Sequence, residues 1–229
     1  MIPKSSLQSQ AYEAIKELIL TNSLDSSKLY SETQLAKNMG ISRTPLREAL
    51  QCLSQDGYIT IIPSRGFKVR VLNKKNARMI IEARCAIEGF CVHSIVADKG
   101  SIRYEKLISQ LEETLEVMRN TVHSEDHIPE FTEADHRFHL LIVHYLGNTE
   151  FNGMYQRLMY MIHLTSTQVL AVPGRLDSTL SEHEAILNYI KSDQGDEAYQ
   201  ALLSHLMMPM NFTFVNDDDD DDIETDDIL

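Results

Sequence analysis

The residues of this chain that are best suited to chemistry are one aspartate and three histidines. Asp135 and His139 stand four positions apart, so on a helix they lie about 40° apart around the axis and one turn along it. His183 and His205 lie among apolar residues in later helical segments, which indicates that their rings point toward a core. Three imidazoles and one carboxylate suit a divalent transition metal. The alternative for each histidine is a hydrogen-bonded place in the core, and spacing alone does not show that the four side chains meet.

Arginine and hydroxyl side chains gather near residue 43 in a way that suits contact with nucleic acid. Arg43 and Arg47 stand four apart, with Ser42 and Thr44 beside them, at the start of a segment whose apolar residues recur at helical spacing. Side chains at the start of such a helix reach base edges when the helix enters the major groove. The alternative is an ordinary helical hairpin whose arginines are solvated.

The elements that position these arginines favour a helix-turn-helix. Ser31 is expected to cap a first short helix, with Gln34 completing a capping box. Gly40 stands where a helix end favours a left-handed residue. Thr44-Pro45 is expected to supply the N-cap and the first position of the second helix.

A β-hairpin is predicted directly after these two helices. Residues 58–62 are rich in β-branched side chains, residues 63–66 read as a turn, and residues 67–71 alternate between apolar and basic. An earlier helix, predicted over 8–20, would pack behind the helix-turn-helix. A hairpin with a basic tip at Arg65 is typical of the wing of a winged helix.

These segments resemble the DNA-binding domain of GntR-type transcription regulators over about residues 8–71. The resemblance is carried by GISRTPLREAL, DGYI and RGFKV, in that order. The loop at 22–27 departs from the family pattern, which favours Gly and a Pro-Gly turn there. We therefore expect a homodimer that binds a palindromic double-stranded DNA operator. The residues expected to contact DNA are Thr33, Ser42, Arg43, Thr44, Arg47, Arg65 and Gly66.

From residue 74 onward the sequence predicts helices only. They are expected at 74–98, 102–122, 129–146, 150–170, 178–192 and 195–212. About six such helices suggest an antiparallel bundle with an interior able to hold a ligand. The expected fold class is mainly α: a winged helix-turn-helix at 1–72, an all-α effector domain at 73–214 and an acidic, disordered tail at 215–229.

The second domain resembles the FCD type of ligand-binding domain, from the FadR branch of the GntR regulators, over about residues 74–212. The matching residues are Glu82, Arg84, Glu88, Asp135, Phe138, His139, Gly147, Asn148, Glu182, His183, Ile186 and His205. Ile142 stands where the family usually has a leucine. The resemblance implies that Asp135, His139, His183 and His205 bind a metal ion, zinc first and nickel as an alternative. It also implies that Arg84 and the metal together hold the carboxylate of a small organic acid.

Charge is segregated along the chain. The formal net charge is −13, yet residues 1–72 hold nine basic and six acidic residues, whereas residues 217–229 hold nine acidic residues and no basic one. The positive excess of the first segment coincides with the predicted DNA-binding domain. The aspartate run at 217–222 is expected to be disordered because like charges repel. No run of 18 apolar residues and no secretion signal are present, so we expect a cytoplasmic protein with no membrane segment.

Taken together, these patterns predict a transcription regulator, a repressor in the first instance, tuned by a small acid. One alternative is a metal-responsive regulator in which the ion itself is the signal. Another is a His/Asp metal-dependent hydrolase, since such a site with an open position could activate water. Against the enzyme, Leu187 stands where a zincin needs a second histidine, and an enzyme has no use for a winged helix.

Overall fold

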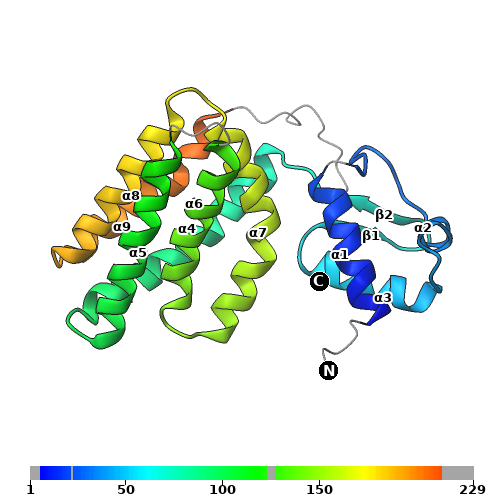
Figure 1. Cartoon of the computed structure of the whole chain (residues 1–229), viewed down its shortest axis with the longest axis horizontal. Helices are drawn as coiled ribbons and strands as arrows, with labels where there is room; N and C mark the ends of the chain where they lie inside the picture. Colours follow the sequence, from blue (N-terminus) through cyan, green and yellow to red (C-terminus); the bar gives the residue numbers. More distant parts are fainter. Residues whose placement is uncertain (1–5, 22, 123–126, 213–229) are drawn as a thin grey trace, which may run out of the picture. The chain divides into compact units, whose positions relative to one another are not determined.

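The structure, a computed structural model, describes residues 6–21, 23–122 and 127–212 and is mainly helical (Figure 1). The predicted acidic tail lies outside the described residues. The described residues form two compact units. One holds the residues up to Val71 together with Gly147–Leu164, and the other holds Leu72–Leu146 and the residues from Thr165 onward. Among the described helices, none is both long and apolar enough to cross a membrane.

Three helices open the first unit. They are α1 (Leu7–Leu20), α2 (Glu32–Met39) and α3 (Arg43–Gln55). The Ser31 side chain caps α2 by accepting a hydrogen bond from the backbone N–H of Gln34, and Gly40 ends the helix at φ 67°. Ser31 and Gly40 therefore cap α2 as the sequence predicts, but the predicted capping box is not completed, because the Gln34 side chain donates to Asn38 Oδ1 at 2.8 Å.

Helix α3 begins two residues earlier than predicted. Its N-cap is Ser42 and its first residue is Arg43, so the prediction of Thr44 as N-cap is wrong. Pro45 is tolerated at the third helical position because the first four N–H groups of a helix have no intrahelical acceptor. The predicted apolar face is confirmed, since Leu46, Ala49, Leu50 and Leu53 are fully buried.

The predicted wing is confirmed as a two-stranded antiparallel sheet. Strand β1 (Ile59–Ile62) pairs with β2 (Gly66–Val69), and Ile59 lies opposite Val69. Gly66 has φ 126°, and a Cβ there would lie 2.0 Å from the carbonyl oxygen of Tyr30. That oxygen accepts a hydrogen bond from the Phe67 N–H, so the backbone approach joins the wing to the chain just before α2. The approach is possible only for glycine.

The second unit contains the helices expected of the effector domain. They are α4 (Lys74–Ala97), α5 (Ile102–Thr121), α6 (His127–His144), the end of α7 (Thr149–Leu170), α8 (Arg175–Lys191) and α9 (Gly195–Met207), followed by the 3-10 helix η1 (Met208–Asn211). Helix α5 packs on α6 and α8, while α4 packs on α6, α8 and α9 (Figure 1). Residues on α4, α6, α8 and α9 therefore share one interior.

Candidate metal centre and nucleic-acid interface

The one aspartate and three histidines meet inside the second unit. Asp135 and His139 come from α6, His183 from α8 and His205 from α9, and one ligand atom of each lies within 4.8 Å of the others. The Nε2 atom of His139 is 3.1 Å from that of His205 and 3.2 Å from that of His183. Asp135 Oδ1 is 3.4 Å from His183 Nε2. A tetrahedral zinc ion with Zn–N bonds of about 2.0–2.1 Å sets its ligands roughly 3.3 Å apart, so the spacing fits such an ion.

Each imidazole is held in place through its other ring nitrogen. His139 Nδ1 lies 2.6 Å from Glu88 Oε2, His183 Nδ1 lies 2.7 Å from the Thr179 carbonyl oxygen, and His205 Nδ1 lies 2.7 Å from Glu182 Oε2. These acceptors require the proton on Nδ1, which leaves a lone pair on each Nε2. Three lone pairs and a carboxylate oxygen then face one another, and a cation stabilises that arrangement. Outer acceptors of this kind are a common feature of metal-binding histidines.

The charge states of the cluster also suit a cation. Burial lowers the pKa of His183 well below its usual value, and it lowers the pKa of His205 even though Glu182 acts in the opposite direction. Burial would raise the pKa of Asp135, but the surrounding histidines outweigh it and hold that pKa below its usual range. Neutral imidazoles and an ionised carboxylate are the forms that bind metal.

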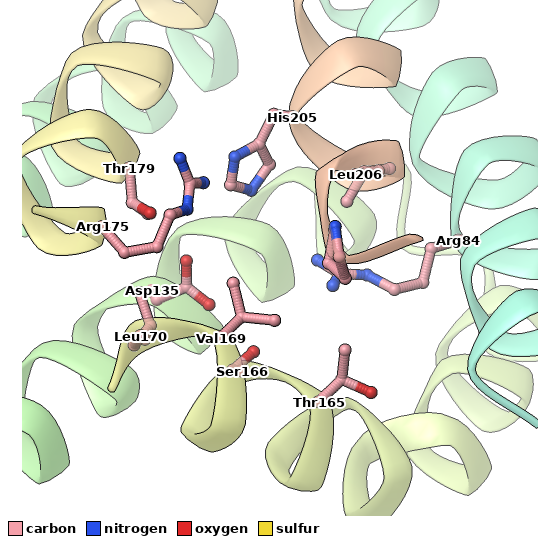
Figure 2. Close-up of a pocket in the computed structure, with 11 residues that line it drawn as sticks. Arg84, Asp135, Thr165, Ser166, Val169, Leu170, Arg175, Thr179, His205 and Leu206 are labelled. Atoms are coloured by element: carbon pink, nitrogen blue, oxygen red, sulfur yellow. The ribbon is translucent and has the colours of Figure 1, made fainter. Parts of the chain in front are cut away.

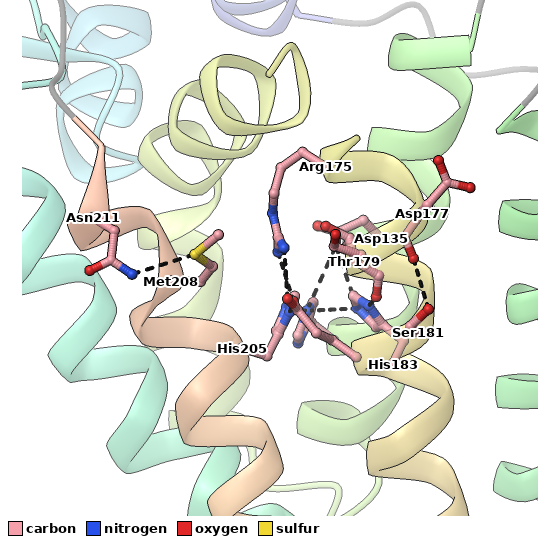
Figure 3. A network of polar contacts seen from close by, with 12 residues as sticks. Asp135, Arg175, Asp177, Thr179, Ser181, His183, His205, Met208 and Asn211 are labelled. Carbon is pink, nitrogen blue, oxygen red and sulfur yellow. Dashed lines mark hydrogen bonds and ion pairs between the residues drawn. The ribbon is translucent and has the colours of Figure 1, made fainter. Parts of the chain in front are cut away.

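Two buried arginines extend the network outward. Arg84 Nε donates to Glu88 Oε1 at 2.7 Å, one turn along α4, and the other oxygen of Glu88 holds His139. On α8, the Arg175 side chain reaches toward His205 (Figure 3) and donates twice to Glu182, at 2.6 and 2.7 Å. Burial would raise the pKa of both glutamates, but their arginine and histidine partners lower it to about 2 in each. Each arginine is therefore linked through one carboxylate to one histidine of the cluster.

A small pocket opens beside the cluster. Its volume is about 30 Å³, and Asp135 and His205 form part of its wall. Arg84, predicted to bind the effector, lines the same pocket from α4, and Arg175 enters from α8 (Figure 2). Hydroxyl and apolar side chains complete much of the lining: Thr165, Ser166, Thr179, Val169, Leu170 and Leu206. The pocket thus places two guanidinium groups next to a site that could hold a metal ion.

Sequence reasoning missed part of this network. The sequence indicates Glu88 and Glu182 only through the family resemblance, and it indicates no role for Arg175 or Thr179. The predicted helix at 178–192 left Arg175 outside, whereas α8 begins at Arg175. The spacing of seven residues between Arg175 and Glu182, two helical turns, is a pattern that could have indicated their contact.

Most of the residues expected to contact DNA lie together in the first unit. Five of the seven line one depression of about 160 Å³: Thr33, Arg43, Arg47, Arg65 and Gly66. Ser42 and Thr44 are exposed at the start of α3 but do not line it. Arg47 forms an ion pair with Glu32 of α2, with an Nη2–Oε2 distance of 3.0 Å. The depression therefore has a basic wall drawn from α3 and the wing, with one acidic side chain in it.

A winged helix-turn-helix followed by a helical domain with a pocket beside a candidate metal centre is the architecture of a DNA-binding transcription regulator with an effector domain. The chain belongs to the GntR family of bacterial regulatory proteins, because it matches that family over residues 7–69 and the FCD domain over residues 79–207. The proteins of these families regulate transcription, and this chain is a regulator and not an enzyme.

Curated relatives match this chain along most of their length. The chain is 27% identical to the uncharacterized HTH-type transcriptional regulator YdhC of Bacillus subtilis, with 86% of each chain covered. It is 28% identical to the gluconate operon transcriptional repressor of Bacillus subtilis, covering 84% of this chain and 78% of the relative.

Solved structures show the same fold. McbR/YncC of E. coli is 20% identical, with a TM-score of 0.68, and the match covers 91% of this chain and 97% of that one. A regulator structure from Rhodococcus is 18% identical, with a TM-score of 0.69, and covers 90% and 97%. A metal-free FCD domain is 22% identical, with a TM-score of 0.50, over 62% of this chain and 94% of that domain.

Proposed function

We propose that this regulator is a repressor that binds a palindromic operator as a homodimer and changes its operator affinity when a small carboxylic acid binds the helical domain. Its DNA-binding domain would span residues 1–72 and its effector domain 73–214. The observation that supports the effector site best is the cluster of three imidazoles, each held through Nδ1, beside a pocket that Arg84 lines. The similarity to the gluconate operon transcriptional repressor, which covers 78% of that protein, supports the assignment as a repressor.

The four clustered residues are assigned to a divalent transition metal, with zinc as the first choice. Asp135, His139, His183 and His205 would hold it, and the bound ion would supply a positive charge that polarises a carboxylate oxygen of the acid. Arg84 would bind the same carboxylate, since a planar guanidinium suits two parallel hydrogen bonds. Glu88 keeps the Arg84 side chain directed along α4 and keeps the His139 ring in one orientation.

In the DNA-binding domain, we assign the exposed side chains of α3 and the wing to contacts with the operator. Arg43 and Arg47 would read base edges or grip phosphate, with Thr33, Ser42 and Thr44 beside them. Arg65 and Gly66 at the wing tip would meet the backbone or the minor groove. The arrangement of five of these residues around one depression supports this assignment.

The route from acid to operator would run along α4. This helix carries Arg84 and begins at Lys74, only a few residues after the wing strand ends at Val69. An acid that pulls Arg84 toward the metal would bias where the preceding winged helix lies. A tenfold change in operator affinity requires that the acid bind the two arrangements with free energies that differ by about 1.4 kcal/mol.

A regulator that senses the metal alone is the second candidate. The observation that favours it is that the cluster offers four ligand atoms within 4.8 Å of one another, the number that a closed structural zinc site uses. A thermal-shift screen of small organic acids separates the two, run on zinc-loaded and on chelator-treated protein. We expect an acid to raise the melting temperature of the zinc-loaded protein only. If zinc stabilises the protein and no acid adds to that effect, the metal-sensing candidate replaces the acid-responsive one.

A further inference from the structure

We propose that the effector is a short dicarboxylic acid and that Arg175 and Thr179 on α8 hold its second carboxylate. This assignment rests on the proposed function, in which Arg84 and the metal hold the first carboxylate. It adds a second recognition point on the opposite side of the pocket.

Two polar atoms on α8 carry the inference. The whole residues Arg175 and Thr179 are only 5% and 1% exposed, and both line the pocket. Among the residues that the structure describes, Arg175 Nε and Thr179 Oγ1 are buried atoms with no hydrogen-bond partner. A buried donor without an acceptor is unfavourable, so a ligand oxygen placed between these atoms would be stabilised.

The edge of the Arg175 guanidinium that carries Nε–H can bind a ligand. Its Nη1 and Nη2 donate to the two oxygens of Glu182, at 2.6 and 2.7 Å. The Nε–H lies on a different edge of the planar group, and that edge matches a carboxylate. Thr179 stands four residues along α8, hence on the same face one turn away. The two side chains can therefore meet the same carboxylate.

The chemistry of the rest of the lining suits the middle of a short diacid. Arg84 and Arg175 reach it from different helices, α4 and α8 (Figure 2). Val169, Leu170 and Leu206 supply apolar surface, which suits a short carbon chain. A free volume of about 30 Å³ has room for about two or three water molecules, so even a short diacid requires the lining side chains to move apart, and an aromatic or long-chain acid requires a larger movement.

A purely structural role for Arg175 makes a different prediction. In that case Arg175 serves only to hold Glu182, which in turn holds His205 Nδ1. Removing the guanidinium would then change zinc affinity but not the choice between acids. Ligand selectivity is thus the property that separates a recognition role from a positioning role.

The test is calorimetry on the zinc-loaded full-length protein with diacids of three to five carbons, each paired with the monoacid of equal length, such as succinate with butyrate. We expect at least one diacid to bind tenfold or more tightly than its monoacid. Arg175→Gln should bring this ratio close to one, while Arg84→Gln should weaken both acids. Thr179→Val is the cleaner variant because it retains the backbone carbonyl that holds His183, and it should weaken only the diacid, by about threefold to tenfold.

Zinc content, measured by mass spectrometry, accompanies every variant. If Arg175→Gln loses zinc, the Thr179→Val result decides. Equal binding of monoacids and diacids, or a diacid preference that Thr179→Val leaves intact, overturns the assignment of α8 and leaves the proposed function standing. If none of these acids binds the zinc-loaded protein, the diacid assignment is overturned, and the wider thermal-shift screen decides the proposed function.

Discussion

Glu88 shows how much one buried carboxylate contributes to the candidate metal centre. Its two oxygens are divided between Arg84 and His139, and it is completely buried. An amide in its place cannot accept from both partners, because one end of the amide is a donor. We therefore predict that Glu88→Gln lowers zinc affinity by about 10- to 100-fold. Competition with a chromogenic chelator measures the effect.

Glu82→Gln is the matched control for that change. Glu82 lies on the same helix, but its side chain is 60% exposed and pairs with Arg78 near the surface. Zinc affinity should stay unchanged in this variant. Equal losses in the two variants would mean that the overall charge of α4, and not the hydrogen bond to His139, sets the affinity.

Arg43 is the residue through which base reading is best tested. It is exposed at the first position of α3, whereas Arg47 is engaged with Glu32. We predict that Arg43→Ala costs about 1–3 kcal/mol of operator binding and relaxes the preference at one base pair per half-site. Binding isotherms on an operator and on a scrambled duplex measure both effects, with Arg78→Ala on α4 as the control. An Arg43→Ala variant that binds both duplexes as the wild type does would remove this residue from the interface.

At the scale of residues, the sequence could identify the four clustered side chains but not what holds them. Asp135 and His139 are recognisable from their spacing, and His183 and His205 from their apolar surroundings, while the family resemblance implies that the four act together. That they meet depends on how α6, α8 and α9 pack, which no spacing within one helix reveals. The link from Arg175 to His205 depends further on the position at which α8 begins.

At the scale of elements, the wing depends on a backbone contact that only glycine allows. A Cβ at Gly66 would lie 2.0 Å from the Tyr30 oxygen, whereas a Cβ at Gly40, also at positive φ, has nothing within 4 Å. Gly40→Ala should therefore cost only the left-handed penalty of about 1–2 kcal/mol. Gly66→Ala should cost more, because the strand must also move away from Tyr30. Urea unfolding of both variants measures the difference, and equal losses would contradict the close contact.

The elements themselves were largely predictable because their signals are local. Ser31 and Gly40 mark the ends of α2, and alternation marks the wing strands. The starts of α3 and α8 differ from the prediction for separate reasons. Ser42 and Thr44 both suit an N-cap by residue type, and α3 begins after the first of them, although the Ser42 side chain receives no cap hydrogen bond. Gly174 precedes α8 and has no side chain, so a side-chain capping pattern is absent there.

At the scale of the whole molecule, an operator with twofold symmetry is expected to bind two copies of the chain. One winged helix makes few contacts with DNA, and two half-sites are matched by a dimer with twofold symmetry. We predict a sedimentation mass near twice the 26.1 kDa of one chain at micromolar concentration. A mass near that of one chain, with operator binding still intact, would contradict dimerisation as the basis of recognition.

The most direct test of acid control is the operator affinity of the zinc-loaded, full-length protein as an acid is added. An operator selected from randomised duplexes and an acid found by thermal shift are the reagents, and His183→Ala is the variant compared with wild type. We expect the acid to change wild-type operator affinity at least tenfold and to leave the affinity of His183→Ala unchanged. An acid that binds the wild-type protein without changing its operator affinity, or one that acts equally on His183→Ala, would contradict control through this site.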